Sequence, residues 1–392
     1  QRGNDDRQGN QSAAETVTGR LKQRLITTHR NTSSGAHMWE YQNDVLSRKG
    51  GYDMKAAIFH GKENIKVEQI KARKPAGKEV MIEVKACGVC GTDMHIYEGA
   101  EGAAKTTPPT VLGHEFSGVV CEIGPDVTSV KVGDRVCVDP NDMCGEWYYC
   151  REGKAHFCEN MIGIGTTVDG GFAEFCTVRE KQVYRIPDGL SFQEAAMAEP
   201  IACCLHGMDL TGIIPGQTVL IVGGGTIGLI MLQLAKISGA GTLILAEPVA
   251  AKRETARKLG ADIVYDSLTE DIDEIMHTYG IKTIDAGIEC VGAKGTMRYT
   301  IDHTGKGGVT MLFGLTSPNT HMDILPFDIF KSEITIKASF INPYTQGRAV
   351  ALLGQGKIDV ASLITDEVKL DDIIDIFETE KFKGRGKIIV RP

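Results

Sequence analysis

The sequence lacks an excess of basic residues. Its 392 residues include 43 Lys and Arg against 51 Asp and Glu, which gives a formal net charge of −8. A chain of this sign does not attract nucleic-acid phosphates or an anionic membrane surface through its net charge. We therefore expect no nucleic acid and no membrane as partner, and we look for a small-molecule ligand instead.

The sequence also lacks an apolar leader of the signal-peptide type near its start, and its 11 cysteines cannot all pair because their number is odd. Disulfides are rare in a reducing cytosol, where cysteines serve as metal ligands or as small buried residues. We expect a cytoplasmic protein whose thiols are free.

Only one stretch, residues 210–235, is uncharged over a length that suits a membrane helix. Gly223-Gly224-Gly225 interrupts this stretch, and Pro215-Gly216 precedes its most apolar part. Glycine and proline favour turns, so a strand, a turn and a helix explain the stretch better than one continuous helix does.

The hydrophobic pattern divides the chain into four segments, and the fold class that we expect is α/β plus β. Residues 1–53 are polar without a sustained apolar period, which indicates a disordered extension or a segment added to the natural protein. Residues 54–202 contain short strands between Gly, Pro and Asp turns, which predicts a β-rich domain. In residues 203–341 apolar strands alternate with helices, which predicts a parallel sheet wound on both faces. We expect residues 342–392 to return to the first domain.

A glycine-rich motif, Gly223-Gly224-Gly225-Thr226-Ile227-Gly228, lies between a predicted strand and a predicted helix. Its glycines allow a tight turn and the close approach of a pyrophosphate, which the helix N-terminus attracts. Glu247 follows about 20 residues later, where a carboxylate can accept the ribose hydroxyls of the adenosine. The carboxylate would repel a 2′-phosphate, so we expect NAD rather than NADP as cofactor, although Lys252 and Arg253 lie close enough to soften that preference.

A second motif brings potential metal ligands together. Cys90 lies in Gly88-Val89-Cys90-Gly91-Thr92-Asp93, His114 and Glu115 adjoin in the sequence, and Glu199 stands near the end of the first domain. Thiolate, imidazole and carboxylate are ligand types of zinc, and three of them leave a position open for water or substrate. Each residue alone could be an ordinary buried residue, but the combination predicts a catalytic zinc site.

With these motifs the chain resembles the zinc-dependent medium-chain alcohol dehydrogenases, and within them the branch of polyol (sorbitol, arabinitol, galactitol-phosphate) and threonine dehydrogenases. The resemblance covers nearly all of residues 54–392. It implies a GroES-like catalytic domain, a Rossmann cofactor domain and a homotetramer or dimer. Further segments that carry it are Gly113-His114-Glu115, Val132-Gly133-Asp134-Arg135-Val136, Gly170-Gly171-Phe172-Ala173-Glu174, Ala198-Glu199-Pro200 and Lys258-Leu259-Gly260-Ala261-Asp262.

The resemblance also implies a ligand set. Cys90 and His114 match the zinc ligands of the family, and Glu115 matches the third ligand of the polyol branch. Glu199 stands where polyol enzymes have a glutamate as a ligand or just outside the ligands. Asp93 would orient His114 from outside the coordination sphere.

The activity implied is the oxidation of a secondary alcohol of a polyol to a ketose. Thr92 matches the hydroxyl that takes the substrate proton, and His95 matches the histidine that passes it to solvent. We expect Asn342 near the cleft between the domains, where its amide suits a hydroxylated substrate. A threonine or 2,3-butanediol type dehydrogenase with the same residues is an alternative, and a non-catalytic dinucleotide-binding protein is a remote one.

One lobe departs from the family pattern of four cysteines that bind a structural zinc. Here only Cys144, Cys150 and Cys158 are present, and Trp147 occupies the place of the second cysteine. Three thiolates make a poor closed tetrahedral site. We expect aromatic side chains rather than a structural zinc to pack this lobe. Candidates for a fourth ligand are Glu146 and His156.

Overall fold

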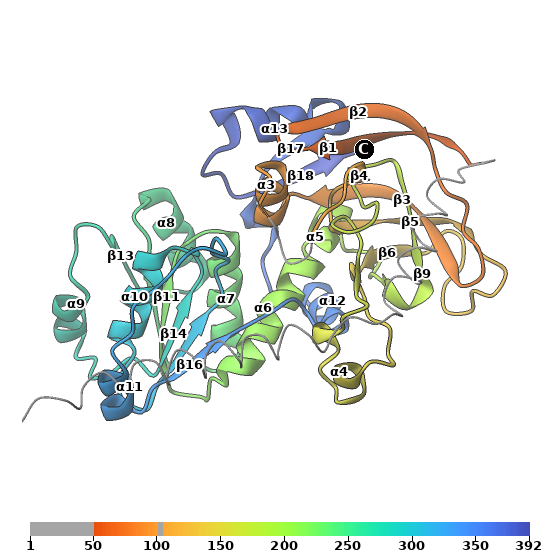
Figure 1. The fold of residues 1–392 in the computed structure, drawn as a ribbon. Helices are drawn as coiled ribbons and strands as arrows, with labels where there is room; N and C mark the ends of the chain where they lie inside the picture. The colour runs from red at the N-terminus through yellow and green to blue at the C-terminus, as the bar shows by residue number, and fades with distance from the viewer. Residues whose placement is uncertain (1–50, 101–104) are drawn as a thin grey trace, which may run out of the picture.

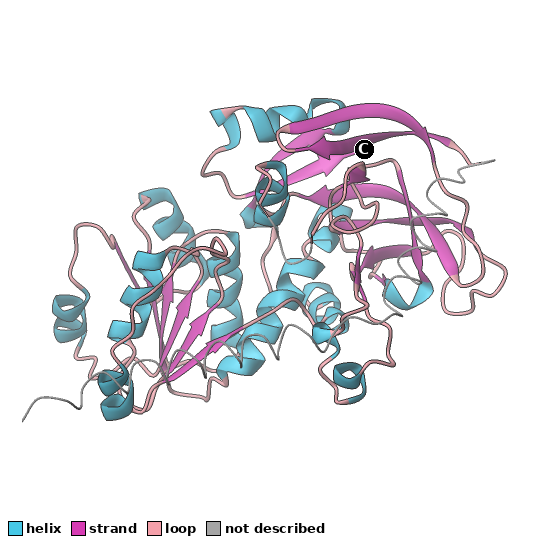
Figure 2. Ribbon diagram, viewed as in Figure 1, coloured by secondary structure: helices cyan, strands magenta, loops and turns pink. Residues whose placement is uncertain are grey.

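The computed structural model describes residues 51–100 and 105–392. A β-rich domain and a domain built on a parallel sheet flank the helix α6 (Ala198–Thr211), which contacts strands of both (Figures 1 and 2). Of the predicted N-terminal extension, residues 1–53, all but the last three residues lie outside the described residues, and Asp53 begins the first strand.

Short strands build the β-rich domain, and most of them join one sheet of seven strands. The strands of this domain are β1 (Asp53–Gly61), β2 (Asn64–Lys71), β3 (Glu79–Gly88), β4 (Thr110–Val111), β5 (Glu115–Ile123), β6 (Arg135–Val138), β7 (Asn141–Asp142), β8 (Ile162–Gly163), β9 (Phe175–Arg179), β10 (Val183–Arg185), β17 (Ile364–Lys369) and β18 (Lys387–Arg391). The seven-stranded sheet has the order β10-β6-β5-β3-β18-β17, and β9 also pairs with β3. Smaller sheets have the orders β2-β1-β4 and β7-β8.

Short helices complete this domain. They are α3 (Gly91–Tyr97), α4 (Tyr148–Arg151), α5 (Phe192–Ala196) and α13 (Ile374–Glu378), with the 3-10 turns η1 (Ala155–Phe157), η2 (Glu180–Gln182), η3 (Ala361–Leu363), η4 (Leu370–Asp372) and η5 (Glu380–Phe382). The last strand, β18, lies antiparallel to β3 and parallel to β17. The end of the chain therefore lies beside the strand that leads to Cys90.

The second domain contains six parallel strands in the order β13-β12-β11-β14-β15-β16. The strands are β11 (Thr218–Val222), β12 (Thr242–Ala246), β13 (Ile263–Tyr265), β14 (Ala286–Glu289), β15 (Val309–Leu312) and β16 (Thr335–Ala338). The helices that follow or cover them are α7 (Thr226–Ile237), α8 (Ala250–Leu259), α9 (Ile272–Tyr279), α10 (Lys294–His303), α11 (Pro326–Ser332) and α12 (Gln346–Gly354). The predicted doubly wound parallel sheet is confirmed.

Strand β11 shows why the uncharged stretch forms part of this sheet. Val219 and Ile221 are buried in the core that includes residues of α6 and α7, whereas Leu220 and Val222 are buried in a core with Ile272 of α9. A strand that is covered on both faces needs apolar residues at successive positions. Among residues 51–100 and 105–392, no helix has the length and apolar character needed to cross a membrane.

Asn342 lies at the domain junction, but the expectation that its amide faces a substrate is wrong. Its side chain is fully buried, with 0% exposed. Its Oδ1 accepts a hydrogen bond from Asn141 Nδ2 at 2.6 Å, and its Nδ2 donates to Asp139 Oδ1 at 3.2 Å and to Gln346 Oε1 at 3.3 Å. Polar groups buried between two domains need partners, so the amide is used to join the domains.

Candidate functional site

A tight junction between β3 and α3 positions Cys90. Cys90 is the N-cap of α3, and its Sγ accepts a hydrogen bond from the amide of Thr92 at 3.5 Å. The amide of Cys90 donates in turn to Asp93 Oδ2 at 2.9 Å. These reciprocal bonds are those of a capping box, so the helix begins at the cysteine and holds its thiol at the end of the sheet.

The neighbouring strand β5 brings His114 and Glu115 to the same end of the sheet. Glu115 is the first residue of β5 and pairs with Gly88 of β3. Any Cβ at position 88 would lie 2.1 Å from Glu115 Oε2, so only glycine leaves room for the carboxylate. The donor atoms of Cys90, His114 and Glu115 all lie within 4.8 Å of one another.

Negative charge surrounds the imidazole of His114. Its Nδ1 lies 3.4 Å from Asp93 Oδ1, and both atoms are buried without a hydrogen-bond partner. Burial by itself lowers the pKa of His114, but the charges of Asp93 and Cys90 outweigh burial and raise the pKa well above its usual value. The site formed by Cys90, His114 and Glu115 therefore attracts positive charge, and a zinc ion fits its sulfur, nitrogen and oxygen donors.

The glycine motif has the geometry that a dinucleotide requires. Gly223 has a φ of +104°, and a Cβ at Gly228 would lie 1.8 Å from the carbonyl oxygen of Gly223. A Cβ at Gly225 would meet no atom within 4 Å, so this side of the loop is open to a ligand. Thr226 and Ile227 then begin α7, whose free N–H groups can bind phosphate.

Glu247 follows β12 and is buried next to this loop. Its Oε2 accepts a hydrogen bond from the amide of Gly224 at 2.7 Å. The nearby Arg253 donates to the carbonyl oxygen of Glu247 and forms an ion pair with Asp266 at 3.2 Å. The charge of Arg253 is thus already paired, whereas Lys252 is half-buried on the same helix.

Known proteins share both parts of this site. Residues 76–188 match the family model of the alcohol dehydrogenase GroES-like domain, and residues 226–353 match that of the zinc-binding dehydrogenase. The chain is 34% identical to sorbitol dehydrogenase of Bacillus subtilis (strain 168) over 345 aligned residues. The aligned region covers 87% of this chain and 98% of the relative. The chain is 35% identical over 351 residues to L-threonine 3-dehydrogenase of Pyrococcus abyssi (strain GE5 / Orsay), covering 88% and 99%.

The chain belongs to the zinc-binding alcohol dehydrogenase family. A crystal structure of a zinc-binding dehydrogenase from Sinorhizobium meliloti 1021 bound to NADP superposes with a TM-score of 0.83 at 37% identity, covering 87% of this chain and 100% of that one. The expected GroES-like catalytic domain and Rossmann cofactor domain are confirmed. This dehydrogenase is accordingly an enzyme that uses zinc and a nicotinamide dinucleotide.

Glu199 lies beside the three convergent ligands of the dehydrogenase but outside their group. It occupies the first turn of α6 and is buried. Cys203, one helical turn later, donates from its Sγ to Glu199 Oε1 at 3.3 Å. Burial raises the pKa of Glu199 to about 7, with a further rise from the charge of Glu115 and a reduction from His114. The sequence reasoning did not anticipate the contact with Cys203.

Thr92 and His95 lie on α3, the helix that begins at the zinc-ligand candidate Cys90. Residues three apart in a helix share one face, so the hydroxyl and the imidazole lie along the same side of α3. Both residues are half-buried.

Lys387 is a residue that the sequence reasoning missed. It begins β18, is buried, and donates from its Nζ to Glu115 Oε2 at 2.6 Å and to the carbonyl oxygen of Val89 at 3.0 Å. Burial by itself lowers the pKa of Lys387, but the charges of Glu115 and Cys90 more than offset this and raise it. No local signal marks this lysine, because only the pairing of β18 with β3 brings it to the site.

The lobe with Trp147 contains the second group of potential metal ligands. The sulfur atoms of Cys144, Cys150 and Cys158 lie within 4.8 Å of one another, and no fourth His, Cys, Asp or Glu of residues 51–100 and 105–392 joins them. Aromatic rings pack around the lobe, and the rings of Tyr149 and Phe157 meet edge-to-face with 5.6 Å between their centroids.

The substitution Lys387→Met tests the charge balance at Glu115. Removing one partner of a buried ion pair leaves the other charge uncompensated, so we expect the metal-free protein to lose about 3 kcal/mol of stability. Zinc supplies positive charge beside the same carboxylate, so adding zinc should raise Tm more in the variant than in the unchanged protein. Thermal unfolding of chelator-treated samples, with and without zinc, measures both effects.

Lys383→Met is the matched control for this experiment. Lys383 is exposed and pairs with the exposed Glu380, so its loss should change Tm little under either condition. An equal decrease in Tm for Lys387→Met with and without zinc would contradict the proposed link between the lysine and the metal.

Proposed function

We propose that this dehydrogenase oxidises a secondary hydroxyl of a polyol or sugar alcohol to a ketone, with NAD as the acceptor. The observation that carries the proposal is the convergence of Cys90, His114 and Glu115 within 4.8 Å at the end of β3 and β5. The relatives named sorbitol dehydrogenase and D-arabinitol dehydrogenase 1 support a polyol as substrate.

In this proposal Cys90, His114 and Glu115 hold the zinc ion, Asp93 orients His114, and Lys387 fixes the carboxylate of Glu115. When bound, zinc lowers the pKa of a substrate hydroxyl and NAD accepts the hydride.

The protein itself removes the hydroxyl proton. In this proposal Thr92 Oγ1 takes the proton of the substrate hydroxyl, and His95, which lies three residues later on the same face of α3, serves to pass a proton on to solvent. The half-buried imidazole of His95 then releases the proton to solvent. The protein thus supplies position and proton transfer, whereas the cofactors supply the redox chemistry.

A threonine or 2,3-butanediol type activity is the alternative, because relatives named L-threonine 3-dehydrogenase have a similar identity of 35%. The residues that would hold zinc do not distinguish these substrates. A non-catalytic dinucleotide-binding protein is a remote alternative, which is disfavoured because the ligand set converges in addition to the glycine loop.

A substrate panel with the unchanged protein and two variants tests the activity. With NAD, we expect higher kcat/KM for sorbitol, arabinitol or galactitol phosphate than for threonine or butanediol. Cys90→Ser should abolish turnover but retain NAD binding, because the thiolate belongs to the metal position and not to the glycine loop. Cys121→Ser, a half-buried thiol on β5, should stay active. Fast turnover of threonine without polyol turnover, or an active Cys90→Ser variant, would contradict the proposal.

The proposed preference for NAD over NADP rests on Glu247. Its carboxylate lies next to the glycine loop, where a 2′-phosphate would meet negative charge. The pairing of Arg253 with Asp266 leaves that guanidinium less able to compensate. The similar structure from S. meliloti, in contrast, is bound to NADP.

Replacing Glu247 with Ser should raise the ratio of kcat/KM for NADP to that for NAD by about tenfold or more, which corresponds to about 1.4 kcal/mol. The serine removes the repulsion of the 2′-phosphate and one acceptor for the ribose hydroxyls. Steady-state kinetics with both cofactors provide the measurement. Glu254→Ser on the exposed side of α8 is the control and should leave the ratio unchanged. An unchanged ratio in Glu247→Ser would exclude this role of Glu247.

The proposal includes a homo-oligomer, a dimer or tetramer, in the cytoplasm. Strand β16 is an edge strand of the parallel sheet, and the preceding α11 exposes Phe327 by 62% and Phe330 by 78%. An open edge with exposed rings beside it favours pairing with a second copy across a two-fold axis.

A cytoplasmic location is supported by the 11 cysteines, all of which are free.

Light scattering tests the assembly. We expect a mass two or four times the chain mass of 42.4 kDa. Phe330→Asp should lower this mass, because a charge would be buried at the interface, whereas Tyr279→Asp at an exposed position on α9 should not. A monomeric unchanged protein would contradict the proposed oligomer.

A further inference from the structure

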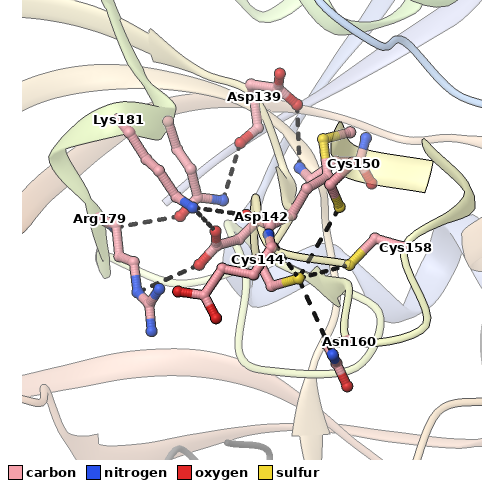
Figure 3. Close-up of polar contacts among 12 residues, drawn as sticks. Asp139, Asp142, Cys144, Cys150, Cys158, Asn160, Arg179 and Lys181 are labelled. Atoms are coloured by element: carbon pink, nitrogen blue, oxygen red, sulfur yellow. Dashed lines mark hydrogen bonds and ion pairs between the residues drawn. The ribbon is translucent and has the colours of Figure 1, made fainter. Parts of the chain in front are cut away.

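Three thiols meet in the cysteine lobe (residues 141–163), apart from the ligands at Cys90. Cys144 Sγ lies 3.4 Å from Cys158 Sγ and 3.9 Å from Cys150 Sγ (Figure 3). In Figure 1 the lobe, marked by α4, projects below the strands of the β-rich domain, whereas α3 lies next to β18. The function proposed above does not use these thiols.

The base of the cysteine lobe is anchored to the main sheet. Asp142 forms ion pairs with Arg179 Nε at 3.2 Å and with Lys181 Nζ at 2.5 Å (Figure 3). Lys181 Nζ also donates to the carbonyl oxygen of Met143 at 2.8 Å. These bonds fix Asp142 and Met143, the two residues that precede Cys144. The position of Cys144 is therefore fixed relative to the sheet.

The backbone after Cys144 turns its amides toward the sulfur. Gly145 has a φ of +78°, a conformation that favours glycine, and the amide of Glu146 donates to Cys144 Sγ at 3.4 Å. Cys158 donates its S–H to the same sulfur. Cys144 Sγ is therefore the acceptor of the group.

The thiols consequently differ in acidity. Burial would raise the pKa of Cys144, but hydrogen bonds from the amides of Glu146 and Trp147 and from Cys158 and Cys150 lower it to about 7. Burial raises the pKa of Cys158 to about 12. A thiolate reacts faster than a thiol, so the half-buried Cys144 is the nucleophile and Cys158 the adjacent protonated partner.

A closed metal site is a poor explanation of the group. Structural zinc sites have four ligands, and here the described residues offer three. The indole of Trp147 occupies the lobe where the family pattern has another cysteine, and its Nε1 is buried without a hydrogen-bond partner. An indole N–H donates only and cannot bind a metal ion.

We propose that the cysteine lobe is a thiol-oxidation site, in which a hydroperoxide converts Cys144 and Cys158 into a disulfide. The thiolate of Cys144 attacks the terminal oxygen of the hydroperoxide, the O–O bond breaks, and the alkoxide or hydroxide leaves and takes a proton. Cys144 is then a sulfenic acid. The sulfur of Cys158 loses its proton and attacks this sulfenic sulfur, the S–S bond forms, and water leaves. Two thiols are oxidised by two electrons, and one hydroperoxide is reduced to an alcohol or water.

The experiment treats the zinc-loaded protein with hydrogen peroxide at pH 7, blocks the remaining thiols with iodoacetamide and identifies peptides by mass spectrometry. We expect a peptide pair joined through Cys144 and Cys158 with the loss of two hydrogen atoms, and its disappearance after treatment with a thiol reductant. Cys144→Ser should abolish this pair, whereas Cys121→Ser should retain it. Because the measurement reads the peptides of the lobe, it is independent of alcohol turnover and of Cys90.

Two further measurements on the unchanged protein test the proposal even if the Cys144→Ser variant fails to fold. The rate at which iodoacetamide modifies Cys144 in the unchanged protein should rise with pH about a midpoint near 7, the value to which its pKa is lowered. Metal analysis should give one zinc per chain. Two zinc ions per chain with lobe thiols that react only after chelation, or peroxide oxidation of Cys144 without a link to Cys158, would overturn the proposal.

Discussion

The burial of several acidic groups in one place is the constraint on which the dehydrogenase depends. Asp93, Glu115 and Glu199 are all buried near the imidazole of His114. Ionised carboxylates are costly to bury unless a positive charge accompanies them. Lys387 supplies one such charge at 2.6 Å from Glu115, and the position between Cys90, His114 and Glu115 is suited to another.

The charge balance at Glu115 depends on the return of the chain to its first domain. The lysine that pairs with Glu115 comes from β18, 272 positions later in the sequence. It reaches the site because β18 is inserted next to β3 in the seven-stranded sheet. The parallel-sheet domain lies between the two segments in the sequence, so the last strand that completes the site follows that whole domain along the chain.

The site at Cys90 and the cysteine lobe differ in chemistry because different groups accompany their thiols. At Cys90 a thiolate, an imidazole and a carboxylate converge, and the surrounding negative charge favours a cation. In the cysteine lobe three sulfurs converge around amide donors, and Trp147 is present where another ligand would be needed. The first group is suited to a metal ion, whereas the second is suited to reaction between its own thiols.

The sequence by itself determined the parts of the protein that depend on neighbours along the chain. The helix over Thr226–Ile237, the glycine loop before it and the strand after it follow from local periodicity and from the need for glycine where backbones approach closely. Tertiary structure alone decided the role of Asn342, which joins the domains, and that of Lys387, which pairs with Glu115. Both roles depend on partners roughly 200 or more residues away, and a lone amide or lysine has the same local pattern whether or not such a partner exists.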